Sequence, residues 1–342
     1  MKKCLFLPAL LALAAFAQAE TTLTWHAKAY GDGRHNAFTD LARWHDAYYL
    51  CFRHGASHLS MDGEIRVMRS ADLKTWEPCV TLDTLGDDRD PHFAVTDKTL
   101  YVFFGVWDLA HAKDSGVPGR GRLRSHFAST EDGNNWSAVQ GVYEPDFWLW
   151  RVRAHEGAFY SMGYYLTWPT FTSGEARLLK SDDALHWTQV SLITKDRLPD
   201  EADIRFHPDN SLELIVRTCD KAGDSMWLRS DPTRSQWRQK DLGVVIHCPV
   251  ITEWRDRCFV AGRGKSEGRS NTGIWEMKDD TVQHLFTLPS RGDTAYPGMI
   301  IPEDARDSDH PVFALSWYSQ HERAENNHDE ASIYVGRVEV KP

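Results

Sequence analysis

Short segments rich in apolar and β-branched residues recur along the whole chain, and polar turns separate them. Each is four to six residues long, and they cover 47–52, 99–104, 158–162, 212–216, 258–261 and 312–317. This is the length of a strand, and it is too short for a typical helix. No segment shows a sustained period of 3.6 residues. The pattern therefore predicts an all-β protein.

A turn motif that ends in tryptophan is repeated along the chain. The copies are Ser70–Trp76, Thr130–Trp136, Ser181–Trp187 and, more loosely, Ser230–Trp237, with tryptophans 60, 51 and 50 residues apart. A hydroxyl and an aspartate can accept backbone N–H groups in a tight turn, and the tryptophan can pack between neighbouring sheets. A period near 50 residues is typical of propeller blades. It predicts a six-bladed β-propeller of four-stranded antiparallel blades, with five blades as the alternative.

The first 19 residues have a different pattern. Lys2 and Lys3 precede an apolar run over 5–16, and Ala17–Ala19 has the small residues that signal peptidase reads. Neither this run nor any later segment has the roughly 18 consecutive apolar residues of a membrane span. We therefore expect a signal peptide over 1–19, a single propeller domain over 20–342, and a periplasmic or secreted protein.

Composition narrows the range of partners. The net charge of -10, with acids and bases interspersed, argues against a nucleic-acid partner, which would require a basic face. The 14 tryptophans favour sugar binding, since indole rings stack on the C–H faces of sugars. The chain has neither a Cys-x-x-Cys pair nor a His-Glu-x-x-His run, so we expect no metal and no cofactor. A metal site assembled from His35, His58 and His92 is the alternative. Nothing in the sequence indicates the oligomeric state.

The Ser-x-Asp…Trp turns resemble the Asp-boxes of the sialidase superfamily, where they are structural and lie on the outer rim. The resemblance implies a glycan-binding site at the top of the central channel. In such a site arginines hold a substrate carboxylate, a tyrosine attacks the anomeric carbon, a glutamate takes the tyrosine proton, and an aspartate serves as acid and base.

The order of motifs along the chain resembles that scheme and implies a role for each matching residue. The implied catalytic residues are Tyr296 as nucleophile, Glu201 as its base and Asp62 as acid/base. The implied carboxylate clamp is formed by Arg53, Arg217 and Arg263. The sequence departs from the family at 35–40, where Asn36 occupies the position of the first arginine. A sugar other than sialic acid, including another acidic one, is therefore an equal candidate.

Other polar and aromatic residues are candidates for the same channel. Asp90 opens a strand and could be a second acid, and His35 precedes Asn36. The segment around Trp148, Trp150 and Arg151 combines aromatic faces with a cation, which suits a sugar platform. We count His35, Asn36, Asp90, Trp148, Trp150 and Arg151 as candidate substrate-binding residues.

Four functional hypotheses fit these residues. The first is an exo-acting glycoside hydrolase of the sialidase type. The second is a propeller polysaccharide lyase, in which arginines neutralise a uronate carboxylate while His35 or Tyr296 removes the C5 proton. The third is a non-catalytic sugar-binding propeller. A five-bladed glycosidase with three carboxylates is the alternative at the level of the fold.

Overall fold

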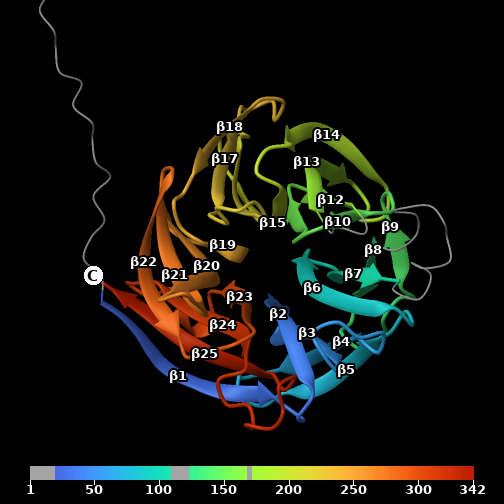
Figure 1. Ribbon diagram of the computed structural model, residues 1–342, viewed down its shortest axis with the longest axis vertical. Helices are drawn as coiled ribbons and strands as arrows, with labels where there is room; N and C mark the ends of the chain where they lie inside the picture. The colour runs from blue at the N-terminus through green and yellow to red at the C-terminus, as the bar shows by residue number, and fades with distance from the viewer. Residues whose placement is uncertain (1–19, 109–122, 168–171) are drawn as a thin grey trace, which may run out of the picture.

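The computed structural model describes residues 20–108, 123–167 and 172–342, which form six antiparallel sheets arranged around a central axis (Figure 1). The expected signal peptide lies outside the described residues. The prediction of six four-stranded blades is confirmed, and the five-bladed alternative is wrong. None of the described helices is long and apolar enough to cross a membrane.

The first three blades contain the strands from residue 35 to residue 194. Blade 1 consists of β2 (His35–Trp44), β3 (Ala47–Gly55), β4 (Glu64–Ser70) and β5 (Glu77–Leu82). Blade 2 consists of β6 (Asp87–Val95), β7 (Leu100–Trp107), β8 (Leu123–Thr130) and β9 (Gln140–Val142). Blade 3 consists of β10 (Phe147–Leu149) and β11 (Arg153–His155), which both pair with β12 (Ala158–Thr167), then β13 (Thr172–Ser181) and β14 (Trp187–Thr194).

The last three blades complete the ring. Blade 4 consists of β15 (Pro199–Phe206), β16 (Leu212–Thr218), β17 (Met226–Ser230) and β18 (Trp237–Asp241). Blade 5 consists of β19 (His247–Trp254), β20 (Arg257–Ser266), β21 (Arg269–Lys278) and β22 (Thr281–Leu288). Blade 6 consists of β23 (Thr294–Ile300), β24 (Val312–Ser319), β25 (Ser332–Lys341) and the N-terminal β1 (Glu20–Tyr30), with a short 3₁₀ turn at Glu303–Ala305.

Blade 6 joins the two ends of the described chain. The strand β1 pairs antiparallel with β25 from Glu20 opposite Lys341 to Tyr30 opposite Ile333. The outermost strand of the last blade therefore comes from the start of the chain, and backbone hydrogen bonds close the ring. The same pairing gives an otherwise exposed sheet edge a partner.

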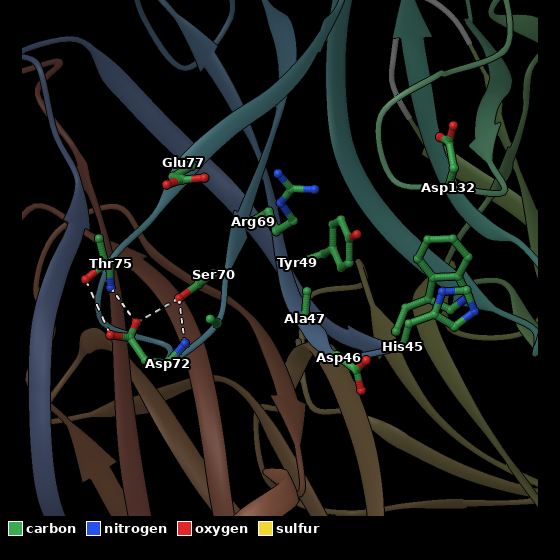
Figure 2. A pocket seen from close by; sticks show the side chains of 12 residues that line it. His45, Asp46, Ala47, Tyr49, Arg69, Ser70, Asp72, Thr75, Glu77 and Asp132 are labelled. Atoms are coloured by element: carbon green, nitrogen blue, oxygen red, sulfur yellow. Dashed lines mark hydrogen bonds between the residues drawn. The ribbon is translucent and has the colours of Figure 1, made fainter.

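The repeated turns connect the third and fourth strands of their blades. In blade 1, Asp72 accepts hydrogen bonds from the backbone N–H groups of Lys74 (2.9 Å) and Thr75 (2.8 Å) and from the Ser70 hydroxyl (3.0 Å). Figure 2 shows the bonds of Asp72 to Ser70 and Thr75. The turn borders a polar hollow of about 560 Å³ that also touches Trp44 and His45. Because β4 runs from residue 64 to residue 70, this turn lies at the opposite end of the blade from the β3–β4 loop.

Five of the six innermost strands contain a β-bulge close to their first residues. The register shifts fall between residues 37 and 40, 89 and 92, 199 and 202, 247 and 250, and 295 and 298. Left-handed backbone angles accompany four of the bulges, at Phe38 (φ 57°), Asp90 (53°), Cys248 (47°) and Tyr296 (46°). A residue other than glycine adopts such a backbone angle at a cost on the order of 1–3 kcal/mol, and residues of this kind tend to cluster at functional sites.

Candidate active site

Strand direction brings most of the candidate residues to one end of the channel. Each innermost strand begins at this end, and the antiparallel second strand of the same blade finishes there. His35, Asp90, Glu201 and Tyr296 therefore belong to the starts of inner strands. Arg53, Arg217 and Arg263 lie near the ends of second strands, so both groups face the same opening.

Glu201 and Tyr296 form the centre of the site. The Tyr296 hydroxyl donates a short hydrogen bond to Glu201 Oε1, which also accepts one from Arg217 Nη1 at 2.8 Å. The other oxygen, Glu201 Oε2, accepts the backbone N–H of Cys248 at 2.7 Å. Glu201 and Tyr296 are 3% and 7% exposed. The bulge in β19 thus positions the Cys248 N–H, and the bulge in β23 positions the Tyr296 hydroxyl, and both donate to the Glu201 carboxylate.

The pKa values of Glu201 and Tyr296 are shifted in opposite directions, so Glu201 is suited to act as a base and Tyr296 as a proton donor. Burial acts to raise the pKa of Glu201, but the Arg217 guanidinium and the Tyr296 hydrogen bond hold it below its ordinary value. Burial, followed by the charge of Glu201, raises the pKa of Tyr296 well above its ordinary value. An ionised carboxylate therefore accepts a hydrogen bond from a protonated phenol, which is the arrangement needed to activate a neutral oxygen nucleophile.

The arginines of the predicted clamp have different surroundings. Arg217 contacts Glu201, and Arg263 donates to the Thr294 carbonyl at 2.9 Å and lies 5.2 Å from the centre of the Tyr296 ring. Arg53 is fully buried and bonds to Asp87 Oδ1 at 2.8 Å and to the Ser57 carbonyl at 2.9 Å. The structure therefore places Arg217 and Arg263 beside the tyrosine, whereas Arg53 supports the β3–β4 loop.

Asn36 uses its side chain within the protein. Its amide donates to Asp32 Oδ1 (3.0 Å), to the Arg34 carbonyl (3.2 Å) and to the Ala331 carbonyl (3.1 Å), and the residue is buried. These bonds connect the start of β2 to the segment before β25. The side chain at the position of the first arginine thus fastens blade 1 to blade 6 and carries no charge.

The two candidate aspartates lie in contrasting environments. Asp62, in the β3–β4 loop, has a side chain that is 48% exposed, forms an ion pair with Arg34 and accepts the Ala56 N–H at 3.1 Å. Asp90 is 5% exposed, and this burial raises the pKa of its carboxyl to about 7. The charge of Arg89 opposes the shift, and the charge of Glu201 adds to it. Asp90 lies in the bulge at the start of β6, at the same end of the channel as Glu201.

The tryptophans of the predicted platform are buried, and one of them contacts the Tyr296 ring. Trp148 and Trp150 are 2% and 1% exposed, and the Trp150 ring lies 5.7 Å from the Tyr296 ring in an edge-on orientation. Trp148 stacks on Tyr164 with ring centres 6.3 Å apart. Neither indole therefore offers an open face to a sugar, because both pack between the blades.

Ion pairs that bridge across the axis occupy the channel beneath the site. Arg151 from blade 3 donates to Asp40 of blade 1 at 2.8 Å and to the Pro297 carbonyl of blade 6 at 3.0 Å. Arg153 bonds to Asp203 of blade 4 at 2.7 Å. Arg151, a predicted sugar contact, thus joins three blades, and a small hollow of about 240 Å³ lies further along the inner strands.

Sequence reasoning did not nominate several residues that the structure brings to the opening. The Phe38 ring lies 4.7 Å from the Tyr296 ring, and the Arg89 guanidinium lies 4.9 Å from the Phe38 ring. Tyr318 and Asp293 contact Arg263. None of these residues carries a local signal. A proline follows Asp90, Cys248 and Tyr296, and it marks a bulge in a buried strand because it cannot donate to the ladder, so this signal could have indicated Cys248.

The comparisons with known proteins concern the fold. No protein-family model matches the chain, and no curated protein matches its sequence. Among solved structures, a protein of unknown function from Dyadobacter fermentans is 15% identical with a TM-score of 0.77, covering 94% of this chain and 99% of that chain. Trypanosoma rangeli sialidase is 10% identical with a TM-score of 0.65, and the match covers 89% of this chain and 55% of the sialidase.

A phage endosialidase extends the same comparison. The phage phi92 enzyme is 11% identical with a TM-score of 0.60, and the match covers 95% of this chain and 69% of the enzyme. The chain thus spans about half the length of the trypanosomal sialidase and two thirds of the phage enzyme. Identities this low concern architecture alone, and the shared architecture is a sialidase-like six-bladed propeller.

Proposed function

We propose that this protein is an exported, exo-acting glycoside hydrolase of the sialidase type that acts on a glycan, with acidic sugars among the candidate substrates. The observation that carries the proposal is the buried hydrogen bond from Tyr296 to Glu201, with Arg217 on the same carboxylate oxygen. This pair supplies a nucleophile with its base already in contact. The similarity to sialidase structures adds support at the level of the fold.

The surroundings of the pair favour an exo-acting enzyme and a substrate with negative charge. Because Arg151 bridges three blades beneath the site, a glycan chain would enter from one end only. Arg217 and Arg263 flank the tyrosine and are suited to bind a carboxylate. Asp90, in the bulge at the same end of the channel, would accept hydrogen bonds from sugar hydroxyls or donate to them.

The test is a panel of 4-methylumbelliferyl glycosides and natural glycans that carry sialic acid, uronic acids or neutral hexoses. Released sugars are identified by mass spectrometry. We expect hydrolysis of one class, and a loss of at least about 10²-fold in kcat for Tyr296→Phe, because the phenol oxygen is the nucleophile. Tyr101→Phe, near the start of β7 and so at the end of blade 2 opposite the site, is the matched control.

Three outcomes would contradict the proposal. An unsaturated uronate product, detected by far-ultraviolet absorbance, would indicate a lyase. Glycan binding without any product, or full activity in the Tyr296→Phe variant, would remove the nucleophilic role. The control variant should keep wild-type activity in every case.

A further inference from the structure

His58 in the β3–β4 loop forms a close pair with an aspartate of blade 6. Its Nδ1 lies 2.6 Å from Asp293 Oδ2, and its side chain is 50% exposed. Asp293 is three residues before Tyr296 and also accepts hydrogen bonds from the Tyr318 hydroxyl (2.5 Å) and Arg263 Nη2 (3.3 Å). The pair is therefore anchored to the strand that carries the proposed nucleophile.

The charge state of Asp293 determines which nitrogen of His58 carries a proton. Burial acts to raise the pKa of Asp293, but hydrogen bonds from His35 and His58 and the charge of Arg263 hold it well below its usual range. An ionised carboxylate only accepts hydrogen bonds, so Nδ1 of His58 must be the donor. Within the described part of the chain no hydrogen bond reaches Nε2, and the side chain as a whole is half exposed.

The position of the ring is fixed from two sides. The His58 ring lies 5.3 Å from the Phe38 ring in an edge-on contact, and Phe38 in turn contacts the Tyr296 ring at 4.7 Å. The backbone carbonyl of His58 accepts a hydrogen bond from Arg89 Nη1 at 3.1 Å. Arg53 holds the same loop through the Ser57 carbonyl. The imidazole is thus held in a fixed position, one aromatic ring away from Tyr296.

Asp62 and Asp90 are less suited to protonate a leaving group. Hydrogen bonds from Ser60 and the Ala56 N–H, together with the charge of Arg34, outweigh burial and lower the pKa of Asp62, which favours its ionised form. Asp90 is only 5% exposed. In an exo-acting hydrolase the leaving group points toward solvent, and among these three residues only His58 combines exposure with a carboxylate that orients it.

The same atoms also meet the distance criterion for a metal site. His35 Nε2, His58 Nδ1 and an oxygen of Asp293 all lie within 4.8 Å of one another. The separations of 2.6 and 3.0 Å from Asp293 Oδ2 are hydrogen-bond distances, however, and the Arg263 guanidinium already balances the carboxylate charge. These contacts favour a hydrogen-bonded histidine–aspartate pair over a metal centre.

We propose that His58 is the general acid and base of the reaction, with Asp293 as the residue that positions it. This inference rests on the proposed hydrolase function. In the first step Tyr296 Oη attacks the anomeric carbon while Glu201 takes the phenol proton. His58 enters this step doubly protonated, with its Nδ1–H bonded to Asp293. As the bond to the leaving oxygen breaks, that oxygen takes the proton from Nε2, and His58 is left neutral. In the second step water attacks the anomeric carbon, Nε2 takes the water proton, the bond to Tyr296 breaks, and Glu201 returns the proton to the tyrosine oxygen.

The test compares leaving groups on the sugar that the glycoside panel identifies. A 4-nitrophenyl glycoside releases a stable anion without protonation, whereas a disaccharide of the same sugar needs an acid. For His58→Ala and His58→Gln we expect kcat/KM to fall by about 10²-fold or more on the disaccharide and by less than about tenfold on the nitrophenyl glycoside. The matched control is His186→Ala, since His186 forms a similar pair with Asp183 (2.7 Å) in an exposed rim turn.

Each other outcome counts against the inference. Equal losses on both substrates, or no loss, would assign His58 a structural role. A leaving-group-dependent loss in Asp62→Asn instead would assign the acid to Asp62. Activity that EDTA abolishes and Zn²⁺ restores would identify the cluster as a metal site. If the wild-type protein releases no sugar at all, the proposed hydrolase function fails and this inference fails with it.

Discussion

Glu201 shows how a single residue acquires its properties from three blades. Its carboxylate receives the Tyr296 hydroxyl from blade 6, the Arg217 guanidinium from its own blade and the Cys248 N–H from blade 5. A buried carboxylate without such partners would be protonated, because burial disfavours the charge. The three donors instead keep it ionised, so its capacity to act as a base depends on the closed ring.

Asp90 leads to a prediction about pH and stability. Its carboxyl has a pKa of about 7 in the folded protein, and an unfolded aspartate titrates near 4. The folded state therefore holds the proton to higher pH, and stability decreases as the pH rises from about 4 to about 7. Asp90→Asn removes this penalty, and asparagine tolerates the left-handed backbone at this position.

We expect Asp90→Asn to stabilise the protein by about 1–3 kcal/mol more at pH 8 than at pH 5. Urea unfolding at the two pH values measures the difference. Asp182→Asn, at a side chain that is 80% exposed, is the control and should change stability equally at both. A gain that is independent of pH would show that Asp90 is not the group that titrates.

At the scale of elements, the inner strands and the rim turns have separate tasks. The bulges turn Asp90, Cys248 and Tyr296 toward the channel, and the proline after each of them removes a ladder donor at the same point. The rim turns are held by local hydrogen bonds to one aspartate and lie at the other end of the blades. A change in a rim turn should therefore affect stability and leave the site intact.

Asp72→Ala tests this separation. The substitution leaves the N–H groups of Lys74 and Thr75 without their acceptor in the folded turn, and we expect Tm to fall by about 2–4 °C with kcat unchanged. Differential scanning calorimetry and the glycoside assay measure the two effects. Asp46→Ala, an exposed aspartate of the same hollow, should change neither (Figure 2). A drop in kcat would show that the two ends of the blade are coupled.

At the scale of the whole molecule, the seam between blade 6 and blade 1 determines whether the site is closed. Asn36, Thr39 and Gly298 all contribute to it, and Thr39 bonds to the Tyr296 carbonyl at 2.7 Å. A Cβ at Gly298 would meet the backbone nitrogen of Leu41 and approach the carbonyl carbon of Asp40 at 2.8 Å. Only glycine permits this approach between two innermost strands.

Gly298→Ala should therefore open the seam. We expect the unfolding free energy to decrease by about 1–3 kcal/mol, because backbone atoms cannot move aside as a flexible side chain would. Gly174→Ala in β13 is the control, since its nearest neighbour lies at 3.4 Å and the effect should stay within about 0.5 kcal/mol. Urea denaturation of both variants gives the comparison, and equal stability of the two would contradict the role of the seam.

The amino-acid sequence by itself was sufficient for the architecture. Strand-length apolar segments and the tryptophan turns near every 50 residues are local features, and repetition of a local unit specifies a ring of blades. The order of Glu201, Arg217, Arg263 and Tyr296 along the chain also indicated residues that the structure brings to one end of the channel. Closure by β1 was not visible in the sequence, because it joins residues more than 300 positions apart.

Only the tertiary structure decided what each candidate contacts. Arg53, Arg151 and Asn36 looked like ligand-facing groups, yet each is buried and bonded to its neighbours within the protein. His58 and Asp293 are 235 residues apart and form a pair only once blades 1 and 6 meet. The physical reason is that burial, bulge direction and partner charges arise from contacts between blades, and a linear motif carries none of these.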